Sequence, residues 1–564
     1  MADVQASAPT LVLTNSDLLS WILTFVAAPR MRGSRSKSHD PSRLAPCATV
    51  CRAFHEIAIR LLWRSLPSLI PLWHLFAPPN TKRPPSSTLQ GDKRPDYLRK
   101  VVSARLYDDP QVWERFLCYT TRVRHIAHST YSSDSPETTV LQLYLIQVIV
   151  LKNGGNPVLP LLHSILWAAK APTDNSLVAL FAPTLRSATL SLQSVPGDEE
   201  TRALLFRRLH ESSPHLENIE LGSGYNSDKD LAVGPLLVQE LLLFDRLRQL
   251  TVHCGLSGPA TFLAFVAKPN LTSLSVRNVS GPSNAPHSPP TVVRDLVELS
   301  IEGTGPTLVG LFELVRFEAL ESATIRIENS PDVRQETEDV LTAFHNTLTS
   351  PSTLRGFTLC IYGWGSKAEG PAISLRDLVR PVLPLQEICS FKFSSHSIRP
   401  QIEVADIAAL TGAWPNLERL VLDAHPPSSS DAFSLDALHY IHAHCPQLRD
   451  LDTHSICLPV LGVHAIPAPL ERPSSSAHAL RRLWASGVYV YRPEYKPGRI
   501  VAEHAEALAR YLLELFPALD MEEYKPWVPR PGVRQTSAPG HCLDGRKVLA
   551  RMYTLTSERE RELQ

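Results

Sequence analysis

The sequence predicts an α/β protein in which a short three-helix segment precedes an irregular solenoid of strand–turn–helix repeats. A six-residue phrase with apolar side chains at its first, fourth and sixth positions recurs from residue 185 onward. Proline accounts for 48 of the 564 residues, well above its usual share of about 5%. Because proline interrupts helices, we expect many short elements joined by turns. The apolar fraction of 43% and the charged fraction of 20% are typical of a folded chain.

The repeated phrase has the spacing of a short strand. Its positions 4 and 6 lie on one face of a strand, whereas position 5 points to the opposite face. Successive phrases begin 24 to 34 residues apart, which leaves room for a helix and two turns. Helical periodicity is present between phrases, for example over Glu199–His210 and Pro235–Phe244. The eleven phrases are LRSATL (185–190), LENIEL (216–221), LRQLTV (247–252), LTSLSV (271–276), LVELSI (296–301), LESATI (320–325), LRGFTL (354–359), ICSFKF (388–393), LERLVL (417–422), LRDLDT (448–453) and LRRLWA (480–485).

This repeat resembles the leucine-rich repeat family, whose units of about 20–29 residues stack with their strands side by side. Most spacings here exceed that range, and the Asn/Cys position of the family is filled only irregularly. The resemblance implies a degenerate array over residues 185–519, with a closing helix over 501–519 that shields the last exposed core face. The alternative is an ordinary α/β domain, because such phrases also arise by chance in strand-rich chains.

The remaining boundaries follow changes in composition. Residues 77–96 contain five prolines and are expected to form a semi-stiff linker. Residues 97–184 are expected to be a helical transition region that leads into the array. Residues 525–564 are expected to form an irregular tail.

Residues 11–66 contain three apolar stretches at helical spacing. The first is LVLTNSDLLSWILTFV, in which Thr14 and Asp17 have the spacing of a capping pair. RLAPCATVCRAF and HEIAIRLLWRSL follow after a basic insertion. About 50 residues cannot bury three apolar helix faces. Because unburied apolar faces mark partner sites, we expect this segment to bind another protein.

The same segment resembles the F-box motif, especially the version common in fungal F-box proteins. In that version a leucine-rich first helix precedes a VCR-aromatic turn and an LLWR helix. The usual Leu-Pro opening is Leu13-Thr14 here, and the insertion RMRGSRSKSHDPSR follows the first helix. Both departures concern the affinity for an adaptor rather than the fold. The matching residues are Val50, Cys51, Arg52, Phe54, Ala58, Leu62, Trp63 and Arg64.

The F-box resemblance implies a non-catalytic substrate receptor of a cullin-based (SCF-type) ubiquitin ligase. The F-box would bind a Skp-type adaptor, and through it a cullin scaffold, while the repeat array captures an unidentified protein substrate. The alternative is a leucine-rich-repeat scaffold or regulator outside any ligase, whose F-box-like helices only cap the array. The expected adaptor-binding residues are Leu18, Leu19, Ile22, Val50, Phe54, Leu62 and Trp63.

Phrase position 5 predicts where the substrate binds, because it points away from the core. Small hydroxyl residues occupy this position in most phrases, and charged or aromatic residues occupy it toward the C-terminus. Aromatic and charged side chains supply most binding hot spots. We therefore expect substrate contacts at Lys392, Asp452 and Trp484, whereas the alternative for Trp484 is burial against the closing helix.

Composition argues against several other classes of protein. Lys+Arg and Asp+Glu are both 56, so no net charge favours nucleic acid, and the basic insertion is expected to be a solvated loop. The nine cysteines are irregularly spaced, unlike those of a secreted disulfide scaffold. The longest apolar run, Val140–Leu151, is shorter than the roughly 20 residues of a membrane span. With no apparent signal peptide, we expect a cytoplasmic or nuclear location.

Known catalytic and metal-binding motifs are not found in the context that they require. His439, His442 and Cys445 lie close together, but no second pair of metal ligands stands at a suitable distance. The sequence therefore predicts neither an enzyme nor a protein with a metal or another cofactor.

Overall fold

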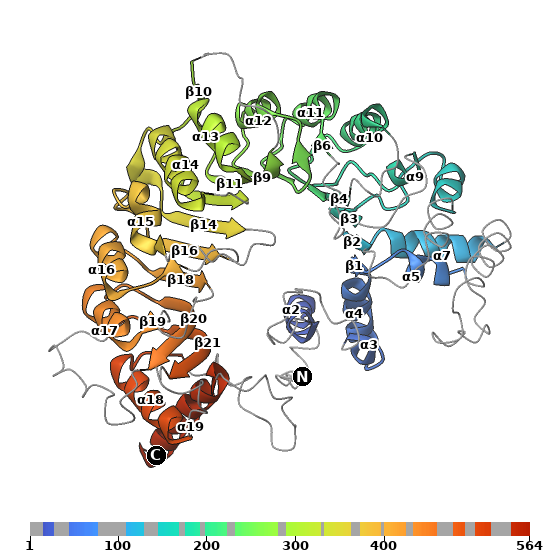
Figure 1. The fold of residues 1–564 in the computed structure, drawn as a ribbon. Coiled ribbons are helices and arrows are strands. Elements are labelled where there is room, and N and C mark those ends of the chain that lie inside the picture. Colours follow the sequence, from blue (N-terminus) through green and yellow to red (C-terminus); the bar gives the residue numbers. More distant parts are fainter. Residues whose placement is uncertain are drawn as a thin grey trace, which may run out of the picture. The chain divides into compact units, whose positions relative to one another are not determined.

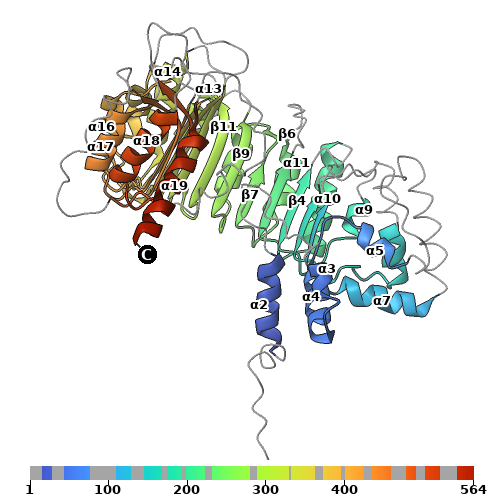
Figure 2. The same cartoon turned by 90° about the horizontal axis from the view of Figure 1, so that it is seen from below.

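The computed structural model divides into two compact units, each built from a parallel sheet and helices. Unit 1 comprises Met1–Ser257 and Lys268–Leu271, and unit 2 comprises Gly258–Ala267 and Thr272–Gln564. In each unit the helices of successive repeats lie side by side along one face of the sheet (Figure 1, Figure 2). The structure describes residues 15–27, 44–76, 109–128, 145–167, 175–191, 198–222, 232–279, 289–328, 332–362, 373–395, 400–424, 433–458, 478–490, 502–520 and 543–563. The predicted linker over 77–96 lies outside these ranges.

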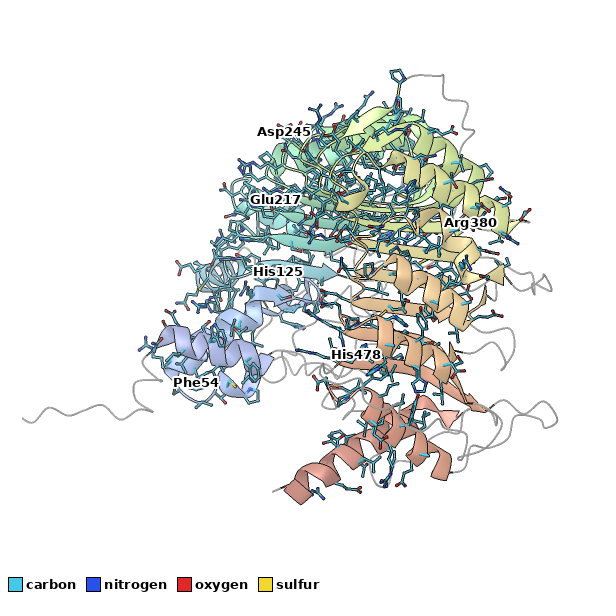
Figure 3. All side chains as sticks on the ribbon, turned by 90° about the vertical axis from the view of Figure 1, so that its left-hand side faces the viewer. Phe54, His125, Glu217, Asp245, Arg380 and His478 are labelled. Carbon is cyan, nitrogen blue, oxygen red and sulfur yellow. The ribbon has the colours of Figure 1, made fainter. Side chains whose placement is uncertain are left out.

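Three helices at the start of unit 1 share a small apolar core. They are α2 (Ser16–Ala27), α3 (Leu44–Cys47) and α4 (Arg52–Arg64). α2 and α3 both pack against α4, and Phe54 is partly buried against the same cluster (Figure 3). The buried members of this core are Leu19, Leu23, Leu44, Ile57 and Ala58.

Two details of these helices differ from the sequence-based prediction. Asn15 caps α2, because its side-chain oxygen accepts hydrogen bonds from two backbone N–H groups of the first turn, at 3.0 and 3.1 Å. The predicted capping residue, Thr14, lies outside the described residues. Cys51 has extended backbone and directly precedes α4, so Phe54 belongs to the third helix rather than to the second.

The sheet of unit 1 begins immediately after α4. Its strands pair in parallel in the order β1 (Ser65–Leu66), β2 (His125–His128), β3 (Ser164–Trp167), β4 (Ser187–Ser191), β5 (Asn218–Gly222) and β7 (Gln249–Val252). β6 (Ala232–Val233) and β8 (Gly255–Leu256) form a further parallel pair. The array therefore starts well before residue 185, and the separate transition region predicted over 97–184 is wrong, because β2 and β3 belong to the same sheet.

The β3 strand contains a phrase that the sequence search overlooked. LHSILW (162–167) places Leu162, Ile165 and Trp167 at positions 1, 4 and 6, and all three are buried. The preceding segment, VRHIAH (123–128), which includes β2, ends in His128 and so departs from the apolar pattern.

Helices connect the strands of unit 1. They are α5 (Ile70–His74), α7 (Pro110–Thr120), α9 (Asn175–Val178), α10 (Glu199–Ser212) and α11 (Pro235–Leu242), so the predictions over 199–210 and 235–244 are confirmed. Glu199 of α10 also caps the next helix, since its carboxylate accepts the backbone N–H groups of Leu236 at 2.7 Å and Leu237 at 3.3 Å. A Cβ at Gly234 would lie 2.3 Å from that carboxylate, so a side chain there would displace Glu199 from its capping position.

The sheet of unit 2 is parallel over its principal strands. In order of pairing they are β9 (Ser273–Val279), β11 (Glu298–Thr304), β13 (Ser322–Glu328), β14 (Gly356–Tyr362), β16 (Ser390–Ser395), β18 (Arg419–Ala424), β20 (Asp450–Leu458) and β21 (Arg482–Val490). Shorter parallel pairs are β10 (Thr291–Val293) with β12 (Val315–Phe317), β15 (Ile373–Ser374) with β17 (Pro400–Gln401), and β19 (Phe433–Ser434) with β20.

Helices follow the strands of unit 2 in turn. They are α12 (Pro259–Val266), α13 (Gly305–Glu313), α14 (Val333–Thr347), η3 (Pro351–Thr353), α15 (Leu375–Val379), η4 (Arg380–Val382), α16 (Val404–Ala413), α17 (Leu435–His444) and α18 (Ala502–Leu515). The alternation of parallel strands and helices confirms the predicted repeat architecture.

Phrase positions 1, 4 and 6 form the apolar core of both units. Every described side chain at these positions is at most 3% exposed. Within unit 2, the rings of Phe344, Phe357, Phe391 and Trp414 continue from repeat to repeat, with successive centroids 5.9, 6.2 and 4.8 Å apart. Each repeat thus completes the core of its neighbour, as expected of a stack in which no unit buries its own apolar face.

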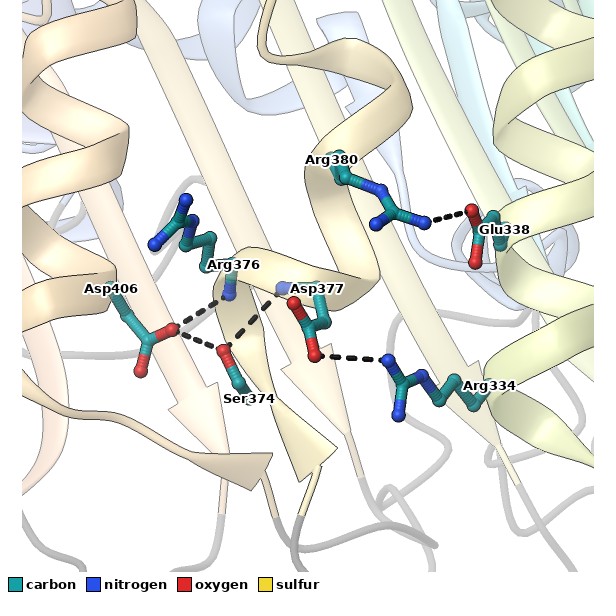
Figure 4. Close-up of polar contacts among 7 residues, drawn as sticks. All are labelled: Arg334, Glu338, Ser374, Arg376, Asp377, Arg380 and Asp406. Carbon is teal, nitrogen blue, oxygen red and sulfur yellow. Dashed lines mark hydrogen bonds and ion pairs between the residues drawn. The ribbon is translucent and has the colours of Figure 1, made fainter.

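Polar side chains also link neighbouring helices of unit 2. The buried carboxylate of Asp406 accepts a hydrogen bond from Ser374 Oγ at 2.5 Å and one from the backbone N–H of Arg376 at 2.9 Å (Figure 4). Arg334 of α14 pairs with Asp377 of α15 at 3.0 Å (Figure 4). These contacts fix the N-terminus of α15 between the helices on either side of it.

The C-terminal part of unit 2 is more ordered than the sequence predicts. β22 (Leu543–Asp544) pairs with β21 in the antiparallel sense, and α19 (Gly545–Leu563) packs against α18. Arg551 of α19 forms an ion pair with Glu506 of α18 at 3.1 Å. The prediction of an irregular tail over 525–564 is therefore wrong for residues 543–563, and two helices close the array instead of one.

Candidate protein-binding surfaces

An apolar stripe lies exposed along one side of α2. Trp21 and Phe25 are 81% and 79% exposed, and Leu18 and Ile22 are 48% and 45% exposed. These four residues occupy positions i, i+3, i+4 and i+7, so they share one helix face, which we call the α2 stripe. The other side of the helix carries residues of the buried core. A contiguous apolar surface of this kind marks a site for a protein partner.

Four of the seven predicted adaptor-binding residues lie on α2 or beside α4. Leu18 and Ile22 belong to the α2 stripe, and Val50, in the turn before α4, is 65% exposed. Leu19 is buried in the helical core, so it stabilises the segment and has no surface to offer a partner. The prediction for Leu19 is therefore wrong, because α2 turns this side chain toward α4.

The other three predicted residues lie on α4 and are half-buried. Phe54 and Leu62 pack against the core of the three helices. Trp63 stacks on Tyr119 of α7, with ring centroids 4.4 Å apart. Trp63 thus joins the helical segment to the first helices of unit 1, and its substitution would disturb that packing.

Sequence reasoning missed the two most exposed members of the α2 stripe. Trp21 and Phe25 stand three and seven residues after Leu18, a spacing that already places them on the same helix face. Leu19 and Leu23, in contrast, lie on the side of α2 that becomes buried.

The predicted substrate-binding residues lie in one row on the sheet of unit 2. We call the face opposite the helices the open face; phrase position 5 points toward it. Strand register aligns Thr358 with Lys392, Lys392 with Val421, Val421 with Asp452, and Asp452 with Trp484. The structure therefore brings the three predicted residues into one row, in which Asp452 and Trp484 are on neighbouring strands and Val421 separates Lys392 from Asp452.

These three side chains differ in their surroundings. Lys392 is exposed, whereas Asp452 and Trp484 are half-buried. Burial raises the pKa of the Asp452 carboxyl, Asp423 raises it further, and Lys392 lowers it. The row therefore combines an exposed cation with a partly buried carboxyl group and a partly buried aromatic ring.

A second row on the open face contains charged residues that the sequence analysis did not consider. The strands extend past position 6, and position 7 lies on the same face as position 5. At position 7, Glu302 of β11 stands between Arg277 of β9 and Arg326 of β13, with N–O distances of 3.8 and 3.6 Å. Lengthening the six-residue phrase by one residue would have found this cluster.

Histidine and aromatic rings pack where α18 meets α17. The ring centroids of His442 and His478 lie 5.3 Å apart, and those of His478 and Phe516 lie 5.1 Å apart. Tyr511 of α18 forms a hydrogen bond with His439 of α17. Burial, together with the neighbouring His442, lowers the pKa of His478 to about 4. The neutral imidazoles therefore hold the closing helix in place.

The described part of the chain offers no candidate site for a metal ion and no candidate membrane span. Within those ranges no group of three or more His, Cys, Asp or Glu side chains is arranged to hold a metal ion. No helix among the described residues has the length and apolar character needed to cross a membrane.

Comparison with known proteins leaves the family open. No family model matches the chain, and no curated protein matches it. Among solved structures, the crystal structure of the Rad7 and Elc1 complex in yeast matches with 12% sequence identity and a TM-score of 0.29. The match covers 68% of this chain and 97% of the other. A similarity this distant supports no conclusion about function.

Proposed function

We propose that this protein is a substrate-recognition subunit of an SCF-type, cullin-based ubiquitin ligase. In this role α2, α3 and α4 act as an F-box that binds a Skp-type adaptor, and the open face of the array holds the target protein. Such a receptor needs no catalytic residue, because other subunits carry the ubiquitin. It would act in the cytoplasm or the nucleus.

The α2 stripe is the observation that carries this proposal. The three helices already have a core of their own, so the stripe is not required to hold them together. Leaving two aromatic side chains about four-fifths exposed is unfavourable for a protein without a partner. Aromatic residues at the centre of a stripe are typical hot spots of protein interfaces. An adaptor with a complementary apolar groove would bury the stripe.

The receptor would work by proximity. Holding a lysine-bearing target close to the charged conjugating enzyme raises the effective concentration of the two reactants. Rigid attachment of the helices to the array serves this purpose, and two contacts within unit 1 supply it. The strand β1 follows α4 without a linker, and Trp63 packs on Tyr119.

The alternative is a repeat scaffold in which α2, α3 and α4 only cap the array. The packing of Trp63 on Tyr119 also favours this role, because terminal repeats must shield their core. The two functions differ in what they require of Trp21 and Phe25. A cap has no use for exposed aromatic side chains, whereas an adaptor site depends on them.

Size-exclusion chromatography of the full-length protein with a purified Skp-type adaptor separates the two functions. A receptor co-elutes with the adaptor in a stable complex, and the variant Trp21→Ala/Phe25→Ala elutes separately from it. Leu151→Ala is the matched control, since Leu151 is 78% exposed in unit 1 but lies outside the three helices. Separate elution of the unmodified protein and the adaptor would favour the scaffold.

A further inference from the structure

The charged cluster at phrase position 7 of unit 2 has one more cation than anions. Glu302 lies between two guanidinium groups, and both distances, 3.8 and 3.6 Å, are too long for good hydrogen bonds. The Nε atoms of Arg277 and Arg326 are buried and have no hydrogen-bond partner. The single carboxylate thus leaves the Nε donors of both arginines unused.

Burial makes this imbalance energetically significant. The side chains of Arg326 and Glu302 are only 24% and 18% exposed, and that of Arg277 is 42% exposed. Partly desolvated charges are costly unless they are paired and hydrogen-bonded. The exposed part of both guanidinium groups nevertheless remains accessible from the open face. A second anion reaching this face would complete the pairing.

The backbone holds the first arginine in a special position. The register between β9 and β11 shifts at this point, so that Arg277 and Asn278 stand opposite Glu302. Asn278 has a φ of 53°, in the left-handed region. Such β-bulges redirect a side chain and are common beside functional sites.

The surroundings of the cluster are compatible with an anionic ligand. The position-5 residues beside it, Ser300 and Thr324, are neutral hydroxyl residues that can donate hydrogen bonds. Glu328, the acid on the open face of β13, is already engaged in a contact of its own. Glu298 lies four residues from Glu302 along β11, a separation beyond the screening length of about 10 Å at ordinary ionic strength.

We infer that Arg277, Glu302 and Arg326 form an anion-recognition site that takes an acidic side chain from an extended segment of the bound protein. This inference rests on the proposed function, because it specifies what the open face selects in a target. The anionic group is a carboxylate or a phosphorylated hydroxyl, since guanidinium groups bind both through the same charge-assisted hydrogen bonds. Glu302 orients the two arginines and at the same time limits the affinity for the incoming anion.

Selection from a displayed library of 12-residue random peptides tests this site on the full-length protein. The unmodified protein should enrich peptides in Asp and Glu, and the variant Arg277→Gln/Arg326→Gln should lose this enrichment. A selected peptide should bind that variant at least tenfold more weakly. Arg294→Gln is the matched control, because Arg294 also pairs with an acid, Glu318 at 3.7 Å, but lies outside the principal strands. Synthetic copies of a selected peptide, with either Asp or phosphoserine in place of its essential acidic residue, distinguish a carboxylate from a phosphate.

The variant Glu302→Gln distinguishes loss of the anion site from misfolding of the double-arginine variant. Removing the competing carboxylate should strengthen the binding of acidic peptides several-fold, a gain that misfolding cannot produce. Three results would each overturn the site. The unmodified protein and the double-arginine variant could select the same peptides, the unmodified protein could select no acidic peptides, or Glu302→Gln could bind acidic peptides more weakly. Adaptor binding by the same preparations is measured separately. If the unmodified protein does not bind the adaptor, the ligase role is refuted, whereas the peptide result still stands.

Discussion

Replacing Trp21 by alanine should abolish most of the affinity for a Skp-type adaptor. The side chain is 81% exposed in the free protein. An aromatic side chain of this size has roughly 230 Å² to bury, so that about 190 Å² is available to a partner. At about 25 cal/mol per Å², full burial would contribute about 5 kcal/mol.

Binding costs reduce this gross value. Immobilising the side chain costs about 0.5–1.5 kcal/mol, and the fit to the partner is imperfect. The remaining loss of about 3 kcal/mol lies within the range of about 2–4 kcal/mol that is usual for strong hot spots. Since each 1.4 kcal/mol corresponds to about tenfold, the dissociation constant should rise about 100-fold.

Isothermal titration calorimetry with purified adaptor measures this change directly. The substitution should leave the unfolding temperature almost unchanged, because exposed side chains contribute within about 0.5 kcal/mol to stability. Leu151→Ala, at a similarly exposed position outside α2, α3 and α4, should keep the original affinity. An affinity that changes less than threefold in Trp21→Ala would refute the assignment of the α2 stripe to the adaptor.

Four further predictions concern unit 2. The pKa of His478 is lowered to about 4 from its usual 6.5, so on acidification the unfolded chain binds a proton at this residue before the folded chain does. The unfolding temperature should therefore be constant above about pH 6.5 and fall between pH 6.5 and 4. This fall should be smaller in His478→Gln. Phe357→Ala, in the continuous aromatic core, should cost about 3–5 kcal/mol in chemical denaturation. Asp406→Ala should cost about 2–3 kcal/mol and increase hydrogen exchange in α15, because it removes buried charge-assisted hydrogen bonds. Substituting Lys392 and Asp452 together should change the set of proteins captured in cells, as compared by mass spectrometry; an unchanged set would move the substrate site elsewhere on the array.

Much of the repeat architecture could be predicted from the sequence because the core obeys a local rule. Phrase positions 1, 4 and 6 alternate in a way that only a half-buried strand satisfies, and these positions are buried throughout the described phrases. The segment around β2 could not be recognised because it ends in His128, a polar residue at a position where the phrase requires an apolar one, whereas LHSILW (162–167) fits the phrase. The final helix, α19, could not be predicted because its charged sequence has little apolar periodicity. It nevertheless contacts α18 through the ion pair between Arg551 and Glu506.

The candidate sites were harder to predict because they depend on orientation and on neighbouring strands. The leucines of α2 appear equivalent in the sequence, but Leu19 faces α4 whereas Leu18 faces outward. The pairing of Glu302 with Arg277 and Arg326 joins three strands, so it depends on which strands lie side by side and not on the phrase alone. For Lys392, Asp452 and Trp484 the sequence predicts only that they share phrase position 5. Their alignment in one row follows from the register of the strands.

Hydrogen–deuterium exchange of the full-length protein, with and without a purified Skp-type adaptor, tests the central claim most directly. If the three helices are an F-box, the adaptor should slow exchange in peptides that cover residues 16–27 and 44–64, and Trp21→Ala should abolish that protection. The repeat strands of unit 2 should exchange at the same rate in both samples. Unchanged exchange in α2 at saturating adaptor, or protection confined to the array, would contradict the proposed function.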